Sequence, residues 1–515
     1  MAKVEHDEDL VIKHVEGGSD GFLDPVLEEE RHMSLVQAAK THWRPLLCCL
    51  ASFGASATFG YDSIANGASL SMPAFLMYFG ELGPTGYYLP AMWTSLWSAF
   101  SYLAQAVGAL AVGFVIDRFG RKWPGAAFSA LTIIGTAVQY TAVTRGVLLA
   151  GKIISGFGIG AAMAIGTTYA SEMAPLKLRA PIQQAIVLCT VIMYAVGLGI
   201  VRVFVPDISE HAFRIVFAIQ WVVGGLATIA FVLIPESPVY LIRHGSLDAA
   251  RKIMERVYPG PSINARMQEL IHTIEEEQSS EQNQDGSYID CFKGTDLKRT
   301  MTAVLIYAAL QIAGAPLLNQ NILILILAGL PAVHAFDIGV GGFALAILGI
   351  LLNWLTMGFF RRHNMFMAGG FVNLVLMVVI GALYYVPGDG ALWAAAVVMN
   401  LLIILQTILL QVMGYPIAAE ISTYRLRGKT ISIATISMAF SNWLVAFVVP
   451  YMYDVDEGNL GLRSAFVFAG LSVFLIVAAW IYIPDTTDLT ASEIDHAYVS
   501  GVPPRKFQSM LENRT

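Results

Sequence analysis

The chain has 515 residues, of which 56 % are hydrophobic and 13 % charged, with a formal net charge of −7 and a mean hydropathy of +0.62. Soluble domains carry roughly 25 % charged residues, so this composition excludes an ordinary soluble protein. No basic patch interleaved with aromatic residues occurs, which argues against a nucleic-acid partner. The four cysteines show neither CxxC nor Cys/His spacing, so no metal site is predicted.

Apolar windows follow one another along most of the chain after an acidic stretch, 1–44, that has no apolar core of a signal peptide. About 20 apolar residues cross a bilayer as a helix, so each window is interpreted as a membrane span with the lipid bilayer as its partner. The twelve windows fall near 45–75, 91–116, 124–144, 147–170, 182–204, 213–234, 299–328, 337–360, 365–386, 391–421, 428–452 and 463–484.

A polar segment, 235–298, interrupts this rhythm after the sixth window. Its apolar residues recur at helical spacing, which predicts amphipathic surface helices; they are Leu247, Ala250, Met254 and Val257, then Met267, Leu270, Ile271 and Ile274. We therefore divide the chain into an N-terminal tail (1–44), a six-helix half (45–234), a helical linker (235–298), a second six-helix half (299–485) and a C-terminal tail (486–515).

Lysine and arginine are distributed unevenly between the two sets of short loops. One set holds Arg118, Arg121, Lys122, Lys177, Arg179, Arg361, Arg362, Arg425, Arg427 and Lys429, and the other only Arg145, Arg202, Arg214 and Arg463. Loops rich in these cations stay in the cytoplasm. We therefore expect both termini and the 235–298 linker to be cytoplasmic, in a multi-pass protein of the plasma membrane.

Three pairs of short motifs repeat at an interval of six spans. GFVIDRFGRK (113–122) pairs with GFFRRHN (358–364), YASEMAPLKLRAP (169–181) with AAEISTYRLRGKT (418–430), and PESP (235–238) with PDTTDLT (484–490). Two homologous six-span halves around a site near the middle of the bilayer are typical of secondary transporters.

The motifs themselves resemble those of one family. FGYDSIANGASLSMPAFLMYFG (59–80) is similar to the first-span signature GYDxxxxGxxxxxPxF of fungal hexose, α-glucoside and quinate permeases. GFVIDRFGRK resembles the loop GxxxDRxGRR of the wider superfamily, and GKIISGFGIG (151–160), SEMAP, PESP and FSNW (440–443) occur in the expected order. Over about residues 45–495 the chain thus resembles the sugar porters of the major facilitator superfamily. The resemblance implies an all-α membrane protein of twelve transmembrane helices in two pseudo-symmetric halves, with a cytoplasmic helical insert, that works as a monomer.

The repeated charged motifs carry one predicted site, a cytoplasmic gate latch. In this hypothesis arginines reach carboxylates at neighbouring helix ends, with Glu172 beside Arg179, and Glu420 beside Arg425 and Arg427. Such pairs are geometrically demanding yet breakable. The alternative is a solvated turn with ordinary charges. The full candidate set is Asp117, Arg118, Arg121, Glu172, Arg179, Arg361, Arg362, Glu420, Arg425 and Arg427. The second copy lacks an acidic residue within GFFRRHN, so we expect the two sides to differ in strength; Gly113 and Gly120 are expected to allow close helix approach and a tight turn.

Asp62 and Lys152 form the second predicted site. A carboxylate inside a membrane span costs free energy, and a carboxylate found there usually has a function. In similar proton-coupled porters the aspartate after GY accepts the proton and pairs with a fourth-span arginine, whose place is taken here by Lys152. We expect Asp62 to alternate between a protonated state and a state paired with Lys152; the alternative is a static ion pair near the interface.

The third predicted site is the substrate cavity, where the resemblance weakens. Gln311, Tyr415 and Asn442 remain as candidates that bind substrate, and Gln320, Asn321 and Gln411 are candidate additions. Positions at which the family carries polar or glycine-proline residues hold Val187, Leu310, Pro316, Val412 and Ala446. Each of these amides has an alternative role as a helix–helix hydrogen bond, worth about 1 kcal/mol in membranes.

These observations predict a secondary active transporter of a small polar solute, a sugar or sugar-like compound, driven without a cofactor by the proton gradient. Two alternatives stay open: transport of a less hydroxylated compound, such as a cyclic organic acid or secondary metabolite, and a non-transporting nutrient sensor. Neither a carboxylate dyad nor a nucleophile–base pair is recognisable in the sequence, so we do not expect an enzyme.

Overall fold

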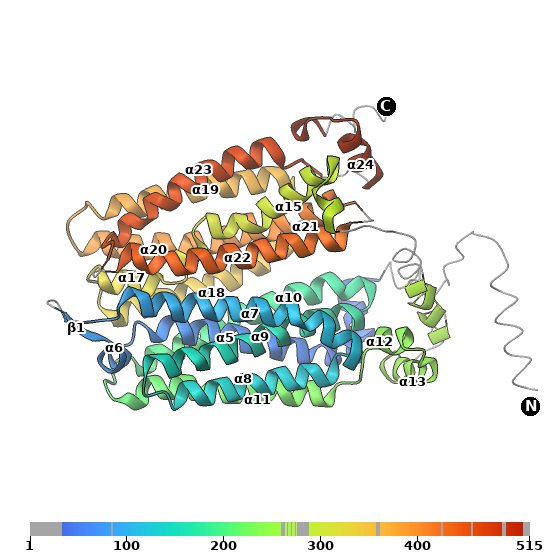
Figure 1. The fold of residues 1–515 in the computed structure, drawn as a ribbon, viewed down its shortest axis with the longest axis horizontal. Coiled ribbons are helices and arrows are strands. Elements are labelled where there is room, and N and C mark those ends of the chain that lie inside the picture. The colour runs from blue at the N-terminus through green and yellow to red at the C-terminus, as the bar shows by residue number, and fades with distance from the viewer. Residues whose placement is uncertain are drawn as a thin grey trace, which may run out of the picture.

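The computed structural model describes residues 33–83, 86–258, 263–275 without 265, 269 and 273, 288–356, 361–423, 426–454, 457–486 and 491–507. Within these residues the protein is almost entirely helical. Its long helices run side by side in two bundles, one from each half of the chain (Figure 1).

The first bundle is preceded by two short helices and followed by the helices of the linker. Its elements are α3 (Leu35–Thr41), α4 (Trp43–Cys48), α5 (Leu50–Ser69), α6 (Pro73–Phe79), β1 (Glu81–Gly83), β2 (Gly86–Tyr88), α7 (Ala91–Phe119), α8 (Lys122–Tyr140), α9 (Arg145–Met173), α10 (Leu176–Phe204) and α11 (Glu210–Leu233), then α12 (Pro238–Arg243) and α13 (Leu247–Val257) of the linker. The two strands pair antiparallel, with Glu81 opposite Tyr88. In α13, Ala250, Met254 and Val257 are buried as predicted, whereas Leu247 is exposed.

The second bundle contains two interrupted spans. Its elements are η1 (Tyr288–Phe292), α15 (Gly294–Ile312), α16 (Ala315–Leu318), α17 (Asn321–Leu327), α18 (Ala332–Thr356), α19 (Arg362–Leu383), α20 (Asp389–Gln406), the π-helical turn η2 (Thr407–Gln411), α21 (Val412–Ile421), α22 (Arg427–Tyr453), η3 (Gly461–Arg463), α23 (Ser464–Tyr482), α24 (Ala491–Val499) and η4 (Pro504–Lys506). Gly314 has φ +95° and starts α16, so the seventh span is broken, and η2 interrupts the tenth. Irregular backbone at membrane depth is tolerated where it is buried in protein or lines a cavity.

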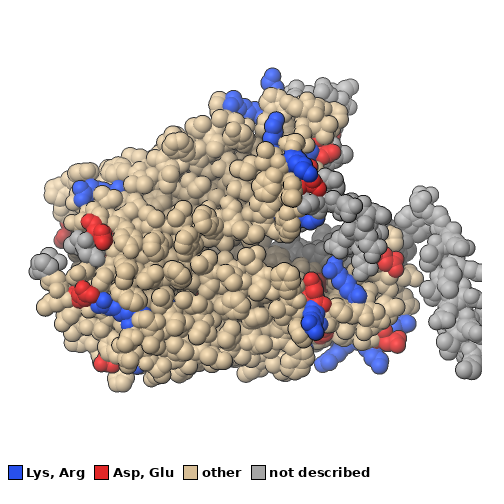
Figure 2. All heavy atoms as spheres, in the orientation of Figure 1, with Lys and Arg blue, Asp and Glu red and all other residues tan. Residues whose placement is uncertain are grey.

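Ten of the described helices are long and apolar enough to cross a membrane. The remaining two predicted windows correspond to α5 and α8, which lie within the first bundle alongside the others (Figure 1). Charged residues gather at the two ends of the molecule, and its sides are almost free of them in the face that Figure 2 shows. The fold thus has the charge distribution of a protein embedded in a bilayer.

Small residues set the spacing of helices in the first bundle. A Cβ on Gly160 of α9 would lie 2.0 Å from the backbone oxygen of Gln105 in α7, and one on Gly108 would lie 2.2 Å from the oxygen of Phe157. Only glycine therefore permits this approach of α7 to α9, as in other membrane helix pairs. The GKIISGFGIG motif serves this packing.

The two ends of the molecule differ, and we name them by their elements. The hairpin end carries β1 and β2, and the insert end carries α12, α13 and α24 (Figure 1). At the hairpin end the halves are joined: Arg202 Nε of α10 lies 2.7 Å from Asp337 Oδ1 of α18, and Thr94 Oγ1 of α7 donates to Asp454 Oδ2 over 3.2 Å. One apolar cluster continues across both halves there and includes Tyr61, Leu198, Leu317 and Ile322.

At the insert end the halves stand apart. Figure 2 shows the surface hollowed between the two bundles on this side. The ion pairs found there among the described residues do not join the two halves; they include the pair of Arg121 with Glu172 and that of Arg362 with Glu420. The structure therefore shows a state closed at the hairpin end and open at the insert end.

Candidate functional site

A hydrogen-bonded chain of three side chains crosses the middle of the first bundle. Asn66 Nδ2 of α5 donates to Asp62 Oδ2 over 2.8 Å, and Lys152 Nζ of α9 donates to Asn66 Oδ1 over 2.6 Å. Asp62 and Lys152 are each 1 % exposed. Asp62 lies twelve residues after the start of α5, or about 18 Å along the helix at 1.5 Å per residue. Both charged residues therefore lie in the interior of the first bundle rather than at a helix end, and hydrogen bonds connect them through Asn66.

Asn66 has a different environment from the two charged residues. It is only partly buried, and so is its neighbour Gly67. A Cβ on Gly67 would lie 3.7 Å from the backbone oxygen of Asn319, which belongs to the other half. Gly67 thus lies at the boundary of the two halves, one residue after Asn66. Sequence analysis missed it, although its position four residues after Asp62 places both on one helix face.

A closed gap, too small for a water molecule, adjoins the carboxylate of Asp62. Its lining includes Thr58, Thr136 and Gln220 of the same bundle. Thr136 Oγ1 donates to Gln220 Oε1 over 2.8 Å, but Gln220 Nε2 and Asp62 Oδ1, both buried, have no hydrogen-bond partner within 3.5 Å among the described residues. An unpaired buried polar atom costs about 1–3 kcal/mol. Asp62 Oδ1 is therefore the carboxylate atom at which a proton could bind without breaking an existing bond.

The predicted substrate-binding residues do not share one environment. Gln311 is buried at the end of α15, and Asn442 is partly exposed in α22. Gln320 is buried and accepts a hydrogen bond from Tyr453 Oη at the end of α22. That bond makes Gln320 a structural link between two spans, as the alternative interpretation of these amides allowed. The side chains of Gln411 and Tyr415 lie outside the part of the chain that the structure describes.

The break in the seventh span exposes a residue that was not predicted. Asn321 is buried at the start of α17, whereas Asn319, two residues earlier, is exposed. The segment that contains Asn319 follows Gly314 and lies against α5 of the other half, as the contact with Gly67 shows. Asn319 is therefore better placed than Asn321 to meet a solute between the halves.

The first charged motif forms a buried cluster at the insert end. Arg121 Nη2 and Nε lie 2.8 and 3.2 Å from Glu172 Oε1, with exposed fractions of 4 % and 12 % for the two side chains. Arg121 also donates through Nη1 to the backbone oxygen of Ile116 over 3.1 Å. Glu172 is thus paired with Arg121, and this contact ties the end of α9 to the loop between α7 and α8.

Glu236 of the PESP motif completes this cluster. Its Oε1 accepts the backbone N–H of Arg121 over 2.7 Å and that of Ser237 over 2.9 Å. Gly120 has φ +80°, and a Cβ there would lie 2.4 Å from Glu236 Oε2. Gly120 therefore makes the tight turn that the sequence predicted. Gly113 has no atom within 4 Å of a Cβ position, so the prediction of close helix approach is wrong for it in this state.

The second motif forms an equivalent cluster in the other half. Arg362 Nη1 pairs with Glu420 Oε1, and Thr486 Oγ1 donates to Glu420 Oε2 over 2.6 Å. Arg361 Nη1 lies 3.9 Å from Asp485 Oδ2. The three repeated motifs thus come together in one cluster in each half.

Other members of the predicted latch lie elsewhere. Asp117 and Arg118 are exposed at the end of α7 and form no ion pair with a described residue. The arginine that reaches Glu420 among the described residues is Arg362. Arg425, and the side chains of Arg179 and Arg427, lie outside the described part of the chain.

The C-terminal segment is fixed to the insert end of the second half. Arg299 Nη2 of α15 lies 2.7 Å from Asp495 Oδ1, and its guanidinium lies 4.5 Å from the ring centre of Tyr498. Burial raises the pKa of the Tyr498 hydroxyl to about 12, so the ring stays neutral at physiological pH. Phe507 is fully buried beside Tyr498. The segment 491–507 therefore covers the ends of several spans.

The structure has two helical bundles that are joined at one end and open at the other, and a network of charged residues is buried between spans of the first bundle. This arrangement defines a membrane carrier built from two structural repeats. Residues 47–498 match the family model described as sugar (and other) transporter. The chain therefore belongs to the sugar transporter family, and it is an integral, multi-pass membrane protein of a family of transporters rather than enzymes.

Curated relatives agree with this assignment. "MFS transporter fmqE" of Aspergillus fumigatus is 40 % identical over 97 % of this chain and 96 % of its own. The "General alpha-glucoside permease" of Saccharomyces cerevisiae is 27 % identical over 98 % of this chain and 83 % of its own. The solved inward-open conformation of the xylose transporter XylE from E. coli has a TM-score of 0.72 at 17 % identity, over 87 % of this chain and 98 % of that chain. The fold is thus the twelve-helix fold of the major facilitator superfamily.

Proposed function

We propose that the protein carries a sugar or sugar-like compound across the plasma membrane by alternating access, coupled to protons through Asp62. The single observation that supports coupling is the chain Asp62–Asn66–Lys152 inside the bilayer. A carboxylate at this depth is expensive and is retained for function. The proton binds at Oδ1, which has no hydrogen-bond partner among the described residues, and Lys152 stabilises the carboxylate once the proton leaves.

Asn66 links this exchange to the substrate. Its amide donates to the carboxylate and accepts from the ammonium, so both bonds are strongest while both groups are charged. Protonation of Asp62 at Oδ1 leaves the bond from Asn66 to Oδ2 but removes the charge that strengthens it, so the amide, one residue before the contact of Gly67 at the boundary between the halves, is held less firmly. A solute at that boundary can therefore favour one protonation state over the other, which is the requirement for coupling.

The contacts between the halves support alternating access. Opening at the hairpin end must break the pair of Arg202 with Asp337 and the bond of Thr94 to Asp454. The clusters of Arg121 and Arg362 hold the helix ends of each half together while the halves move as bodies. We interpret these clusters as the gate latch of the carrier in its open state at the insert end.

The substrate cavity supports a second candidate, a less hydroxylated compound such as a cyclic organic acid. Gln320 is committed to Tyr453, and Asn321 is buried, so two of the predicted additional hydroxyl-binding residues are not free in this state. Sugars need many paired polar groups because unpaired ones are costly. Asn319 and Asn442 remain for that purpose, whereas Gln311 is as buried as Asn321. A sensor that does not transport is not favoured by any contact in the described residues.

The orientation and the energy source complete the proposal. The insert end carries the arginine-rich loops, so it faces the cytoplasm together with both termini. The protein acts as a monomer, needs no cofactor, and uses the proton gradient across the membrane. Its partners are the transported small molecule and the lipid bilayer.

The test is uptake by a transporter-deficient yeast that expresses the chain. Labelled hexoses, disaccharides, polyols and quinate are offered at acidic and neutral external pH, to the wild type and to Asp62→Asn. We expect acid-stimulated uptake of a panel member that is lost in Asp62→Asn. Uptake that is independent of pH and kept in Asp62→Asn would contradict coupling. No uptake of any member by a protein present at the plasma membrane would contradict the choice of substrate.

A further inference from the structure

A groove lies on the outside of the first bundle, at its insert end. It has a volume of about 660 Å³ and is formed by α4, the start of α5, the end of α11 and α13. Its walls are apolar side chains that are half-exposed or more, among them Leu47, Leu50, Leu226, Ile229 and Leu233. α11 crosses the membrane, so this part of the groove is continuous with the lipid-facing surface.

The rim of the groove is positively charged. Arg44 of α4 and Arg256 of α13 both line it and are exposed, and Arg44 Nη1 donates to the backbone oxygen of Arg256 over 3.0 Å. Among the residues that the structure describes, no carboxylate lies within 4.0 Å of either guanidinium. Trp43 is half-exposed beside them, with the Arg44 guanidinium 5.6 Å from its ring centre. Tryptophan at this position is typical of the boundary between acyl chains and head groups.

We propose that this groove binds one anionic phospholipid. The acyl chains lie along the apolar walls between α5 and α11, and the phosphate lies between Arg44 and Arg256. Arginine binds phosphate through parallel N–H donors, and basic pockets beside membrane helices attract anionic head groups. The bound lipid would join the linker helix α13 to α4 and α11. The proposal concerns a lipid and is independent of the transported substrate and of proton coupling.

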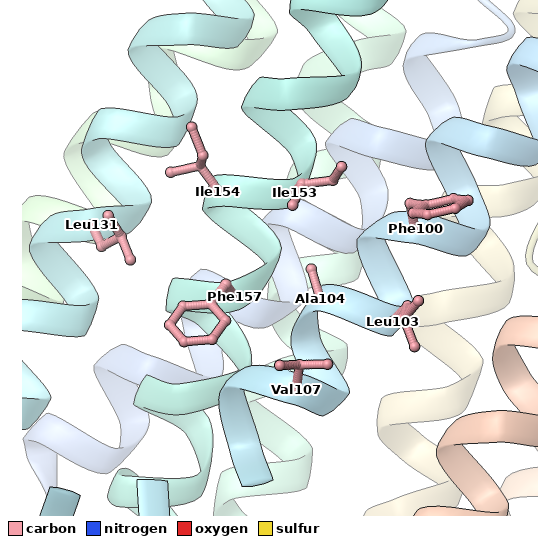
Figure 3. Close-up of a pocket in the computed structure, with 8 residues that line it drawn as sticks. All are labelled: Phe100, Leu103, Ala104, Val107, Leu131, Ile153, Ile154 and Phe157. Carbon is pink, nitrogen blue, oxygen red and sulfur yellow. The ribbon is translucent and has the colours of Figure 1, made fainter. Parts of the chain in front are cut away.

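A second groove of the same bundle shows what distinguishes this site. It lies between α7, α8 and α9, has a volume of about 420 Å³, and is lined by apolar side chains such as Phe100, Leu131 and Phe157 (Figure 3). No charged residue lines it. It can accept an acyl chain of any lipid but cannot select a head group, so it serves as an internal comparison.

The test is native mass spectrometry of the full-length protein with phosphatidylinositol and phosphatidylcholine of identical acyl chains, at equal concentrations. We expect one retained phosphatidylinositol and at least fivefold less phosphatidylcholine on the wild type. In the double variant Arg44→Gln/Arg256→Gln, retained phosphatidylinositol should fall at least fivefold. Arg44→Lys keeps the charge and should fall less. Arg251→Gln is the matched control, because Arg251 lies on the same helix α13 but pairs with Glu255.

A variant that fills the groove tests the apolar part separately. Ala230→Trp places a large side chain between the walls and should lower retention of phosphatidylinositol without removing a charge. Thermal unfolding in detergent verifies that each variant is folded. Equal retention of phosphatidylinositol by wild type, double variant and Arg251→Gln would overturn the site. Equal retention of both lipids by the wild type would overturn the selection for an anionic head group.

Discussion

Replacement of Asn66 by leucine tests the proposed coupling most directly. Leucine has nearly the same size as asparagine but neither donates nor accepts a hydrogen bond. The variant therefore keeps the packing of α5 and removes both bonds, of 2.8 Å to Asp62 and 2.6 Å from Lys152. No charge is deleted, so any effect comes from the loss of the link between the two charges.

The expected effect follows from the strength of the two bonds. A hydrogen bond to a charged group is worth about 1.5–3 kcal/mol, so the charged pair loses about 3–6 kcal/mol of stabilisation. Each 1.4 kcal/mol corresponds to about a factor of ten in an equilibrium constant, so the charged state falls in population by about a hundredfold or more relative to the neutral state. A cycle that must pass through the charged pair to release its proton then slows at least tenfold.

The assay separates coupled from uncoupled transport in vesicles that contain the purified protein. An imposed pH gradient drives net uptake, whereas exchange between equal solute concentrations needs no net proton movement. We expect Asn66→Leu to lose at least tenfold in driven uptake and far less in exchange, which also shows that the variant is folded. Ser63→Ala is the control on the same helix, because Ser63 Oγ donates to the backbone oxygen of Phe59 and bonds neither Asp62 nor Lys152 among the described residues. Wild-type driven uptake with an unchanged pH profile in Asn66→Leu would refute the reasoning.

Two further predictions concern the ends of the molecule. Asp337→Asn removes the exposed pair with Arg202, worth about 0.2–1 kcal/mol, so opening at the hairpin end should increase by a factor of about 1.5–5. The measurement is the alkylation rate of a cysteine introduced in the apolar cluster that joins the halves at this end. An unchanged rate would contradict a role of this pair in closure. Gly120→Ala forces a side chain into a backbone conformation reserved for glycine, at a cost of about 1–3 kcal/mol, and against Glu236. Its thermal unfolding temperature should fall, whereas Gly113→Ala, with open space around its Cβ position, should leave it equal or higher; the reverse order would show that the turn is not under this constraint.

The sequence predicted those parts of the site that depend on the chemistry of one residue. Asp62 and Lys152 stand out because charges are rare in apolar windows, and the structure buries both. Asn66 does not stand out in this way, because an amide side chain in a span as often makes a helix–helix hydrogen bond as it serves a function. The spacing of four residues from Asp62 could have identified it. Its contact with Lys152 could not have been predicted, because it depends on how closely α9 approaches α5.

Pairing between motifs was harder to predict than the motifs themselves. The latch hypothesis brings arginines of the charged loops to Glu172 and Glu420, but the sequence does not say which arginine reaches which carboxylate. The structure selects Arg121 and Arg362, which come from the loops that follow the second and eighth spans. The choice of Arg121 depends on the positive φ of Gly120, which aims the next residue at Glu236 and Glu172. Backbone geometry of this kind is not contained in residue type or spacing.

The broken seventh span shows a similar limit within the substrate cavity. A continuous helix would keep the faces of Gln311 and of the later amides in a fixed relation. Gly314 ends α15 with φ +95°, and the helical register starts anew in α16 and again in α17. As a result Asn319 is exposed, whereas Gln320 turns toward Tyr453. A pattern with a period of 3.6 residues cannot be extended across such a break.

The clusters of Arg121 and of Arg362 are built from corresponding motifs but differ in burial. This difference indicates that they have different roles. Arg121 and Glu172 are 4 % and 12 % exposed, whereas Arg362 and Glu420 are 37 % and 35 % exposed. Loss of one partner of a buried pair costs about 3–5 kcal/mol, because the other charge stays unpaired, whereas an exposed pair contributes about 0–1 kcal/mol. The unequal strength expected from the degenerate second motif therefore has a structural basis. The first cluster is suited to stay intact, and the second is the one that solvent and a moving helix end can separate.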